Sequence, residues 1–283
     1  MLMKTNSLQI NLNNHLIDLS SPVVMGIVNV TPDSFFIGNR FVTDKTILQA
    51  VEKMVLEGAL IIDIGGYSTR PKAEIISPEE EIRRLSEALE VILNKFPDVI
   101  ISIDTFRSSV VRQIVNNFGI AMVNDVSGGT LDDLMFETIA DLRVAYVLMH
   151  MRGTPQTMQL NLKYDDVVSE VIHFLEKRLA QLYLLGVKDV IIDPGFGFAK
   201  SIEQNYKLLN KLKYFQQLHV PVLAGISRKS MVSAVLKIDA TEALNATTAA
   251  NMLALIGGAS ILRVHDVKEA MQAISIYKKY IQE

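Results

Sequence analysis

The chain of 283 residues contains no cysteine and no tryptophan. Without cysteine it can form no disulfide, no thiolate metal site and no cysteine nucleophile. The formal net charge of −3 gives no clustered excess of lysine and arginine, so we expect no nucleic-acid partner. No apolar run approaches the ~20 residues of a membrane span, and the opening MLMKTN lacks the apolar core of a signal peptide. These absences predict a cytoplasmic globular protein with no membrane partner.

What the sequence does contain is a short apolar run that recurs along its whole length. The runs are rich in valine, isoleucine and leucine, as parallel strands buried on both faces are. They cover residues 23–28, 60–64, 99–104, 120–124, 144–149, 190–193, 222–226 and 260–264. We therefore expect eight strands of a largely parallel sheet.

Helical patterns separate these runs. The first has Asp44 as its expected N-cap and stops at Gly58, and the second opens with Ser77 and Pro78. Further helices are expected near residues 108–118, 132–141, 165–185, 203–217, 230–237, 242–257 and 266–281.

Eight strands alternating with helices predict an α/β fold, a single (β/α)₈ TIM barrel that spans residues 1–283 as one domain. Residues 8–19, LQINLNNHLIDL, alternate like a short N-terminal hairpin that covers the bottom of the barrel. Periodicity cannot show whether a sheet closes, so an open doubly wound sheet is the alternative fold.

A polar group follows each predicted strand, at the end where barrel enzymes build their active sites. A single aspartate there often only caps the next helix, but a polar group at all eight strand ends points to a site. The groups are Asn29, Asp63, Asp104, Asn124, His150, Asp193, residues 227–230, and Arg263 with His265.

Two chemistries are represented in this set. Asp104, Asn124 and Asp193 are acceptors suited to a flat ligand with several N–H donors, such as an aminopyrimidinone ring. The cations come from different loops and suit a phosphate or diphosphate; they are Arg70, Lys229, Arg263 and His265. Asn29 offers a carbonyl oxygen to a hard cation such as Mg²⁺.

Other chemistries find little support in the sequence. There is no G-x-G-x-x-G after a strand, no Walker A lysine, no G-x-S-x-G and no H-E-x-x-H. His150 fits either a ligand contact or a supporting role behind one. Met149 fits either the face of a flat ring or the core.

The strand ends as a set resemble those of dihydropteroate synthases, enzymes of the folate pathway. The resemblance spans the chain and rests on MGIVNVTPDSF, IIDIGGYSTRP, ISIDTFR, VNDVSGG, VLMHMRGTPQTMQ, IDPGFGFAKSIEQNYKLL, GISRKS and RVHDV. It implies a transferase that condenses (7,8-dihydropterin-6-yl)methyl diphosphate with 4-aminobenzoate, with Mg²⁺, to give 7,8-dihydropteroate and diphosphate. It also implies a homodimer and inhibition by sulfonamides.

The resemblance also implies a role for individual residues. Asp104, Asn124, Asp193 and Lys229 would hold the pterin, with Met149, Phe198 and Val264 as further contacts. Asn29 would contact Mg²⁺ and diphosphate. The phosphate side would be completed by Thr69, Arg70, Arg263 and His265. Asp33 and Phe35 would act from a first mobile loop, and Ser230 would meet the aminobenzoate carboxylate. The residues implied in catalysis are Asp104, Lys229, Asp33 and Arg263.

Two loops depart from that pattern. Tyr67 stands where the family usually has glutamate, and Lys72 stands where it usually has glycine. Residues 36–39 also differ from the usual first loop. These differences concern rate and aminobenzoate affinity more than reaction type. The alternatives are a methyltetrahydrofolate–corrinoid methyltransferase-like protein, and a pterin-binding barrel without activity.

Overall fold

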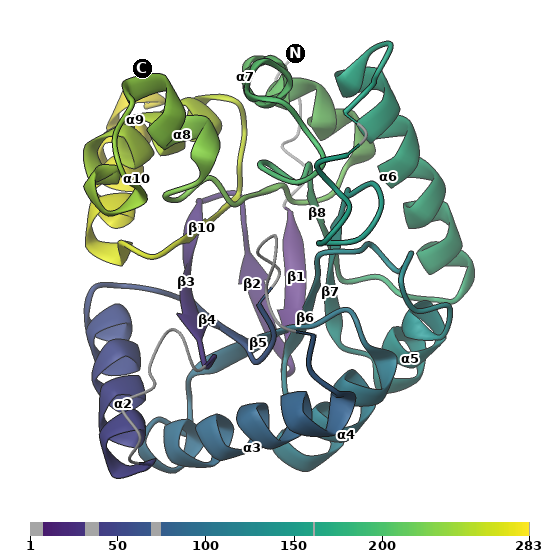
Figure 1. Cartoon of the computed structure of the whole chain (residues 1–283), viewed down its shortest axis with the longest axis vertical. Helices are drawn as coiled ribbons and strands as arrows, with labels where there is room; N and C mark the ends of the chain where they lie inside the picture. Colours follow the sequence, from purple (N-terminus) through teal and green to yellow (C-terminus); the bar gives the residue numbers. More distant parts are fainter. Residues whose placement is uncertain (1–7, 32–39, 69–74, 161, 283) are drawn as a thin grey trace.

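An eight-stranded parallel sheet forms the centre of the molecule (Figure 1). This computed structural model describes residues 8–31, 40–68, 75–160 and 162–282. The sheet order is β8-β7-β6-β5-β4-β3-β10-β9. The strands are β3 (Val23–Asn29), β4 (Ile61–Gly65), β5 (Ile100–Asp104), β6 (Met122–Asp125), β7 (Ala145–Met149), β8 (Val190–Asp193), β9 (Leu223–Ala224) and β10 (Ile261–Val264).

The two ends of this order meet, because Ile192 in β8 forms a parallel bridge with Val222, the residue before β9. Ile192 N also donates to Pro221 O at 2.9 Å. The strand order runs without the reversal of a doubly wound sheet, so the predicted barrel is confirmed and the open-sheet alternative is wrong.

Helices follow one another around the outside of the sheet in chain order (Figure 1). They are α2 (Arg40–Leu56), α3 (Pro78–Lys95), α4 (Ser108–Phe118), α5 (Met135–Leu142), α6 (Val167–Leu184), α7 (Ile202–Asn210), α8 (Ser230–Leu236), α9 (Leu244–Ile256) and α10 (Val267–Tyr280), with 3₁₀ turns η1 (Leu212–Leu218) and η2 (Ala240–Glu242). In the described ranges, none of these helices combines the length and apolarity needed to cross a bilayer.

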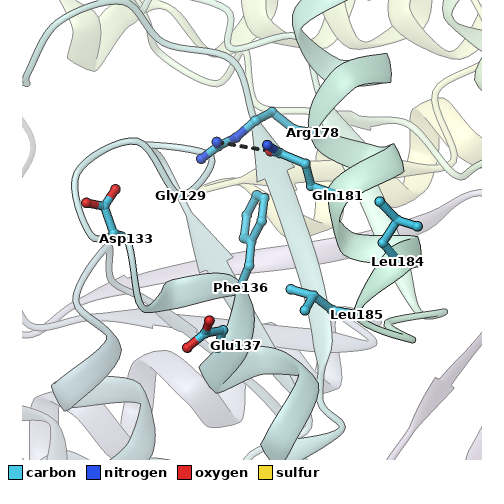
Figure 2. A pocket seen from close by; sticks show the side chains of 8 residues that line it. All are labelled: Gly129, Asp133, Phe136, Glu137, Arg178, Gln181, Leu184 and Leu185. Carbon is cyan, nitrogen blue, oxygen red and sulfur yellow. Dashed lines mark hydrogen bonds between the residues drawn. The ribbon is translucent and has the colours of Figure 1, made fainter.

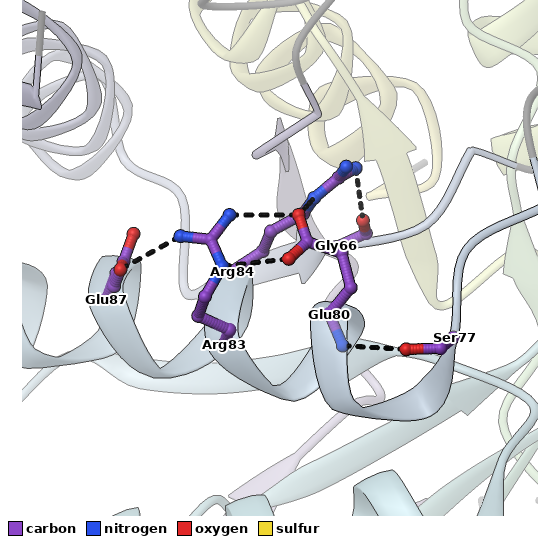
Figure 3. Close-up of polar contacts among 6 residues, drawn as sticks. All are labelled: Gly66, Ser77, Glu80, Arg83, Arg84 and Glu87. Atoms are coloured by element: carbon purple, nitrogen blue, oxygen red, sulfur yellow. Dashed lines mark hydrogen bonds and ion pairs between the residues drawn. The ribbon is translucent and has the colours of Figure 1, made fainter.

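The helix boundaries were predicted with mixed success. Glu80 N donates to Ser77 Oγ at 3.3 Å, so the predicted cap of α3 is confirmed (Figure 3). α2 begins at Arg40, so Asp44 lies inside the helix and its prediction as the N-cap is wrong. The expected helix over residues 203–217 is split, because α7 ends at Asn210 and a 3₁₀ turn continues the segment.

The predicted hairpin is confirmed and closes the bottom of the barrel. β1 (Gln9–Leu12) pairs antiparallel with β2 (His15–Asp18), and the two asparagines of the turn adopt left-handed φ angles of 50° and 63°. Ile10 and Leu12 are buried together with Met25 and Ile61, which lie in the N-terminal halves of β3 and β4. With this end filled by apolar side chains, the other end is left to polar groups.

Candidate active site

One row of residues crosses four neighbouring strands at the top of the barrel. Asn29 pairs with Gly65, Gly65 with Asp104, and Asp104 with Asn124. Because Gly65 has no side chain, its neighbours can approach: a Cβ placed there would lie 3.3 Å from Asn29 Oδ1 and 3.6 Å from Asp104 Cβ. The register therefore brings three predicted site residues together.

Arg263 links this row to a deeper layer. Its Nη2 donates to Asp104 Oδ2 at 2.7 Å and its Nε donates to Asp63 Oδ2 at 2.6 Å. Asp63 also accepts from Asn124 Nδ2 at 2.9 Å, and its side chain is fully buried. Asp63 was recognised only as a strand end and was given no role. Its position two residues before Gly65 was the available signal, since side chains two apart on a strand share a face.

A second group faces this network from β8 and the segment after β9. Asp193 Oδ1 accepts from Gly195 N at 2.7 Å. A Cβ on Gly225 would lie 3.7 Å from Lys229 Nζ, 3.8 Å from Asp193 Oδ2 and 3.9 Å from Arg263 Cβ. The missing side chain of Gly225 thus leaves space among three predicted site residues.

Lys229 is held from the opposite side by the segment after β8. Its Nζ donates to Phe196 O at 2.5 Å and lies 4.6 Å from the centroid of the Phe198 ring. The predicted contacts Lys229 and Phe198 therefore belong to one cluster with Asp193.

The turn of residues 227–230 is fixed to the end of β10. Arg228 has a φ of 55°, in the left-handed region, and its Nε and Nη2 bind both oxygens of Asp266 at 2.8 and 2.7 Å. Ser227 Oγ lies 3.0 Å from His265 Nδ1 and accepts from His265 N at 3.2 Å. Ser230 is exposed as the first residue of α8.

Burial changes the acid–base properties of these groups. It raises the pKa of Asp104, against the effect of the Arg263 guanidinium. It also raises the pKa of Asp193, against the effect of Lys229. Burial lowers the pKa of Lys229 to about 8, while Asp193 favours its charged form. In this buried cluster, each carboxylate or cation is therefore favoured in its charged form by an opposite charge nearby, which opposes the effect of burial.

The two residues with open roles take different positions. His150 is buried, and its Nδ1 lies 3.0 Å from Lys200 Nζ, while its ring meets Phe174 edge-on. Burial, with Lys200 nearby, lowers the pKa of His150 to about 2. Met149 belongs to a small apolar cluster that Phe198 joins from the side. His150 thus lies behind the loop that follows β8, and Met149 is buried in the apolar cluster against which Phe198 packs.

Val264 is also fully buried, in the main core. Four of the predicted site residues, Asp33, Phe35, Thr69 and Arg70, lie outside the described residues, as do Lys72 and residues 36–39.

Tyr67, which stands where the family usually has glutamate, lies within the described residues and contacts two other loops. Its hydroxyl accepts from Gln156 Nε2 at 3.0 Å, and its ring meets Phe106 edge-on with centroids 5.4 Å apart. The Arg107 guanidinium lies 5.2 Å from the Tyr67 centroid and donates to Glu81 at 2.8 Å. A tyrosine is therefore accommodated here by aromatic and hydrogen-bonding partners.

The neighbouring backbone is held by the first turns of α3 (Figure 3). Arg84 donates to Gly66 O at 3.4 Å and to Glu80 at 2.7 Å. Hydrogen bonds from Arg83 and Arg84 lower the pKa of Glu80 to about 2. The end of β4 is thus tied to a charged helix start.

A cavity of about 350 Å³ lies between α5 and α6, outside the barrel (Figure 2). Arg178 crosses it, with its guanidinium 4.5 Å from the Phe136 centroid and its Nε donating to Gly128 O at 2.9 Å. None of its lining residues belongs to the strand-end cluster. The cavity backs the glycine turn that follows Asn124.

No preformed cluster of metal ligands is found among the residues that the structure describes. Within that part of the chain, no group of three or more histidine, aspartate or glutamate side chains is placed to ligate a metal ion. Asn29 Oδ1, beside Asp104, remains a single neutral oxygen of the kind that Mg²⁺ accepts when substrate phosphates complete its shell.

The chain belongs to the family of pterin-binding enzymes, whose pattern matches residues 25–265. It is 43% identical over 269 residues to the dihydropteroate synthase of Haemophilus influenzae, covering 94% of this chain and 96% of that protein. It is 43% identical over 254 residues to the enzyme of the same name from Synechocystis, covering 89% of this chain and 87% of that protein.

Solved structures agree with this assignment. The Xanthomonas albilineans dihydropteroate synthase with 4-aminobenzoic acid is 37% identical, with a TM-score of 0.90 over 98% of this chain and all of that one. The Yersinia pestis enzyme in a sulfonamide drug complex is 34% identical, with a TM-score of 0.89 over 97% of this chain and all of that one.

Proposed function

We propose that this chain is a dihydropteroate synthase. It is a transferase that condenses (7,8-dihydropterin-6-yl)methyl diphosphate with 4-aminobenzoate, giving 7,8-dihydropteroate and diphosphate in folate biosynthesis. The observation that carries the proposal is the strand-end cluster, in which Asp104, Asn124 and Asp193 meet Lys229 and Arg263. Acceptors for a ring and cations for a diphosphate occur together there.

The pterin is recognised by acceptors that the protein has already oriented. Asn124 uses its Nδ2 on Asp63, so its Oδ1 is the atom that accepts an N–H of the ring. Asp193 uses Oδ1 on Gly195 N and turns Oδ2 toward the space at Gly225. A carboxylate and an amide oxygen held in this way read the amino and N–H groups of a pterin.

The harder task in this reaction is breaking the carbon–oxygen bond, because the aniline nitrogen is a neutral nucleophile that needs no strong base. If diphosphate leaves first, the ring methylene becomes a cation, which the carboxylate of Asp104 stabilises. Arg263 and His265 stabilise the departing anion. Among the described residues, only two of the five N–H groups of Arg263 are used, so three are available to the ligand.

Mg²⁺ fits this site as an ion shared with the substrate. Asn29 Oδ1 would hold it, together with oxygens of the bound diphosphate. The ion neutralises charge on the leaving group when bound. Asp104, across Gly65 from Asn29, favours a cation at this end of the row.

The aminobenzoate carboxylate would bind at Ser230, whose backbone N–H, in the first turn of α8, has no carbonyl partner within the helix. The complexes of related enzymes with 4-aminobenzoate and with a sulfonamide support this assignment of the second substrate. A sulfonamide should therefore compete with aminobenzoate. A cytoplasmic location stays a prediction.

The proposal is tested by incubating the purified chain with both substrates and Mg²⁺. We expect diphosphate release that aminobenzoate stimulates, with dihydropteroate formed when both substrates are present. Asp193→Asn should lower it, whereas Asp98→Asn, an exposed residue ahead of β5, should not. A folded protein that binds the pterin and releases no diphosphate would be an inactive barrel. One that transfers methyl from methyltetrahydrofolate would be the methyltransferase.

The same proposal includes a homodimer formed through α8, α9 and α10, which lie together in Figure 1. Large apolar side chains are exposed there, with Leu236 53%, Leu253 52% and Ile276 63% exposed. Light scattering should give twice the chain mass, and Ile276→Lys should halve it. The control Leu160→Lys, at an exposed leucine in the β7–α6 connection, should leave the dimer intact.

A further inference from the structure

The segment between β8 and α7 has an unusual backbone. Three of its residues adopt left-handed φ angles, 72° at Gly195, 81° at Gly197 and 50° at Ala199. A Cβ on Gly195 would lie 2.0 Å from His150 O, so the backbone itself is pressed against β7. Such a conformation persists only where its surroundings hold it.

A buried lysine lies at the centre of this segment. Lys200 is 4% exposed. Its Nζ lies 2.9 Å from Gly195 O, 2.9 Å from Phe198 O and 3.0 Å from His150 Nδ1. An ammonium group has three N–H donors and no acceptor, so it can serve both carbonyls and the His150 ring in the tautomer whose Nδ1 carries no hydrogen; His150 O lies further away, at 3.4 Å. The loop therefore wraps around one charged group.

The charge of Lys200 is sensitive to its surroundings. Burial lowers the pKa of Lys200 to about 7, while Asp193 favours the charged form. Gly195 O and Phe198 O can only accept hydrogen bonds, so both favour the protonated form of Lys200 with its three N–H donors.

The other side of the same loop holds Lys229. Phe196 O accepts from Lys229 Nζ at 2.5 Å, and the Phe198 ring lies under the same atom. A Cβ on Gly197 would be only 2.9 Å from Lys229 Cδ, so the stem of Lys229 also follows the loop. These contacts with Lys229 are made by residues 196–198, which lie within the stretch from Gly195 to Phe198 whose first and last carbonyls accept from Lys200.

We infer that Lys200 is a positioning residue: its ammonium group fixes the loop of residues 195–199, which in turn fixes Lys229 in the pterin site. This inference rests on the proposed function. Lys200 is buried behind the loop and acts through it, because the partners of its ammonium group lie inside the protein.

The test is Lys200→Met, which keeps the length of the side chain and removes the ammonium. The assay is run at about pH 6, below the pKa, so that Lys200 carries its charge in the unaltered protein. Loss of charge-assisted hydrogen bonds behind the loop should raise the KM and the calorimetric Kd for the pterin diphosphate about tenfold. The KM for aminobenzoate should stay within about twofold. Lys188→Met, at an exposed lysine ahead of β8, should change neither.

A double-mutant cycle shows whether the effect passes through Lys229. When Lys229→Met is already present, adding Lys200→Met should weaken pterin binding by less than about twofold, since the residue it positions is gone. Independent, multiplying losses would overturn the inference, as would equal losses for both substrates or an unchanged pterin Kd.

Thermal unfolding checks that each variant is folded, and Lys200→Gln replaces Lys200→Met under the same criteria if the latter is not. The binding measurement needs no turnover. An unaltered chain that binds pterin but releases no diphosphate would remove the proposed function and leave the positioning role to be decided by the Kd.

Discussion

Replacing Arg263 by glutamine should damage both stability and activity, and the two losses can be separated. Its guanidinium bridges Asp63 and Asp104, whose side chains are 0% and 11% exposed. Without it, the described contacts of Asp63 are reduced to the amide of Asn124 at 2.9 Å. Removing one partner of a buried ion pair costs ~3–5 kcal/mol, so we expect the free energy of unfolding to fall by that amount. This is a large share of the ~5–15 kcal/mol typical of a domain.

A second substitution removes the buried negative charge of Asp63, which Arg263→Gln leaves without its cation. Adding Asp63→Asn to Arg263→Gln should restore about 2 kcal/mol of the free energy of unfolding, because burying a neutral amide costs less than burying a carboxylate. Diphosphate release should stay low in the double variant, since the cation that faces the ligand is still missing. Urea unfolding followed by circular dichroism measures the first quantity, and a diphosphate assay measures the second.

The control is Arg112→Gln, whose ion pair with Asp141 is exposed, with side chains 48% and 64% accessible. It should change the free energy of unfolding by less than about 1 kcal/mol. A double variant no more stable than Arg263→Gln would contradict the account of Asp63. Recovery of activity together with stability would show that Arg263 serves only the fold.

Three further outcomes are expected. Asp193→Asn should weaken pterin binding about tenfold to a hundredfold, as loss of a charge-assisted hydrogen bond worth roughly 1.5–3 kcal/mol requires; unchanged calorimetry would remove Asp193 from the site. Gly225→Ala should leave the melting temperature unchanged, because its Cβ finds only ordinary contacts of 3.7 Å or more, yet it should weaken pterin binding by filling the pocket. Burial lowers the pKa of His150 to about 2, so this side chain stays neutral in the folded protein until the pH approaches 2. The free energy of unfolding is unaffected by His150 above its ordinary pKa of 6.5 and falls as the pH drops from 6.5 toward 2, because only the unfolded chain takes up the proton. Urea unfolding at about pH 5 should show a cost of about 2 kcal/mol that His150→Gln abolishes, and an equal pH dependence in both proteins would refute this.

The strands and the ring of polar strand ends could be predicted because both are local. A strand buried on both faces must be apolar along its length, and a side chain placed just after it must reach the top of the barrel. Asn29, Asp104, Asn124 and Asp193 follow from that rule alone. The start of α2 was missed because aspartate is a residue type that often caps a helix, whereas this helix already begins at Arg40, four residues before Asp44.

The contacts between distant segments could not be predicted. Arg263 and Asp63 are 200 positions apart, and only the closed sheet brings them together. Lys200 gave no signal because a lysine just ahead of a helix is usually exposed. Its burial depends on a backbone path with three left-handed residues, which no periodic pattern encodes.

The short pairing between β8 and β9 has a consequence for where the barrel opens locally. β9 has only two residues, and in the described structure one isolated bridge, at Ile192 and Val222, accompanies the hydrogen bond from Ile192 N to Pro221 O. Amide hydrogens along this seam should therefore exchange with solvent sooner than those of the neighbouring ladders. Asp193 and Lys229 lie on opposite sides of this contact, so a pterin bound by both would stabilise the contact between β8 and β9 and slow that exchange.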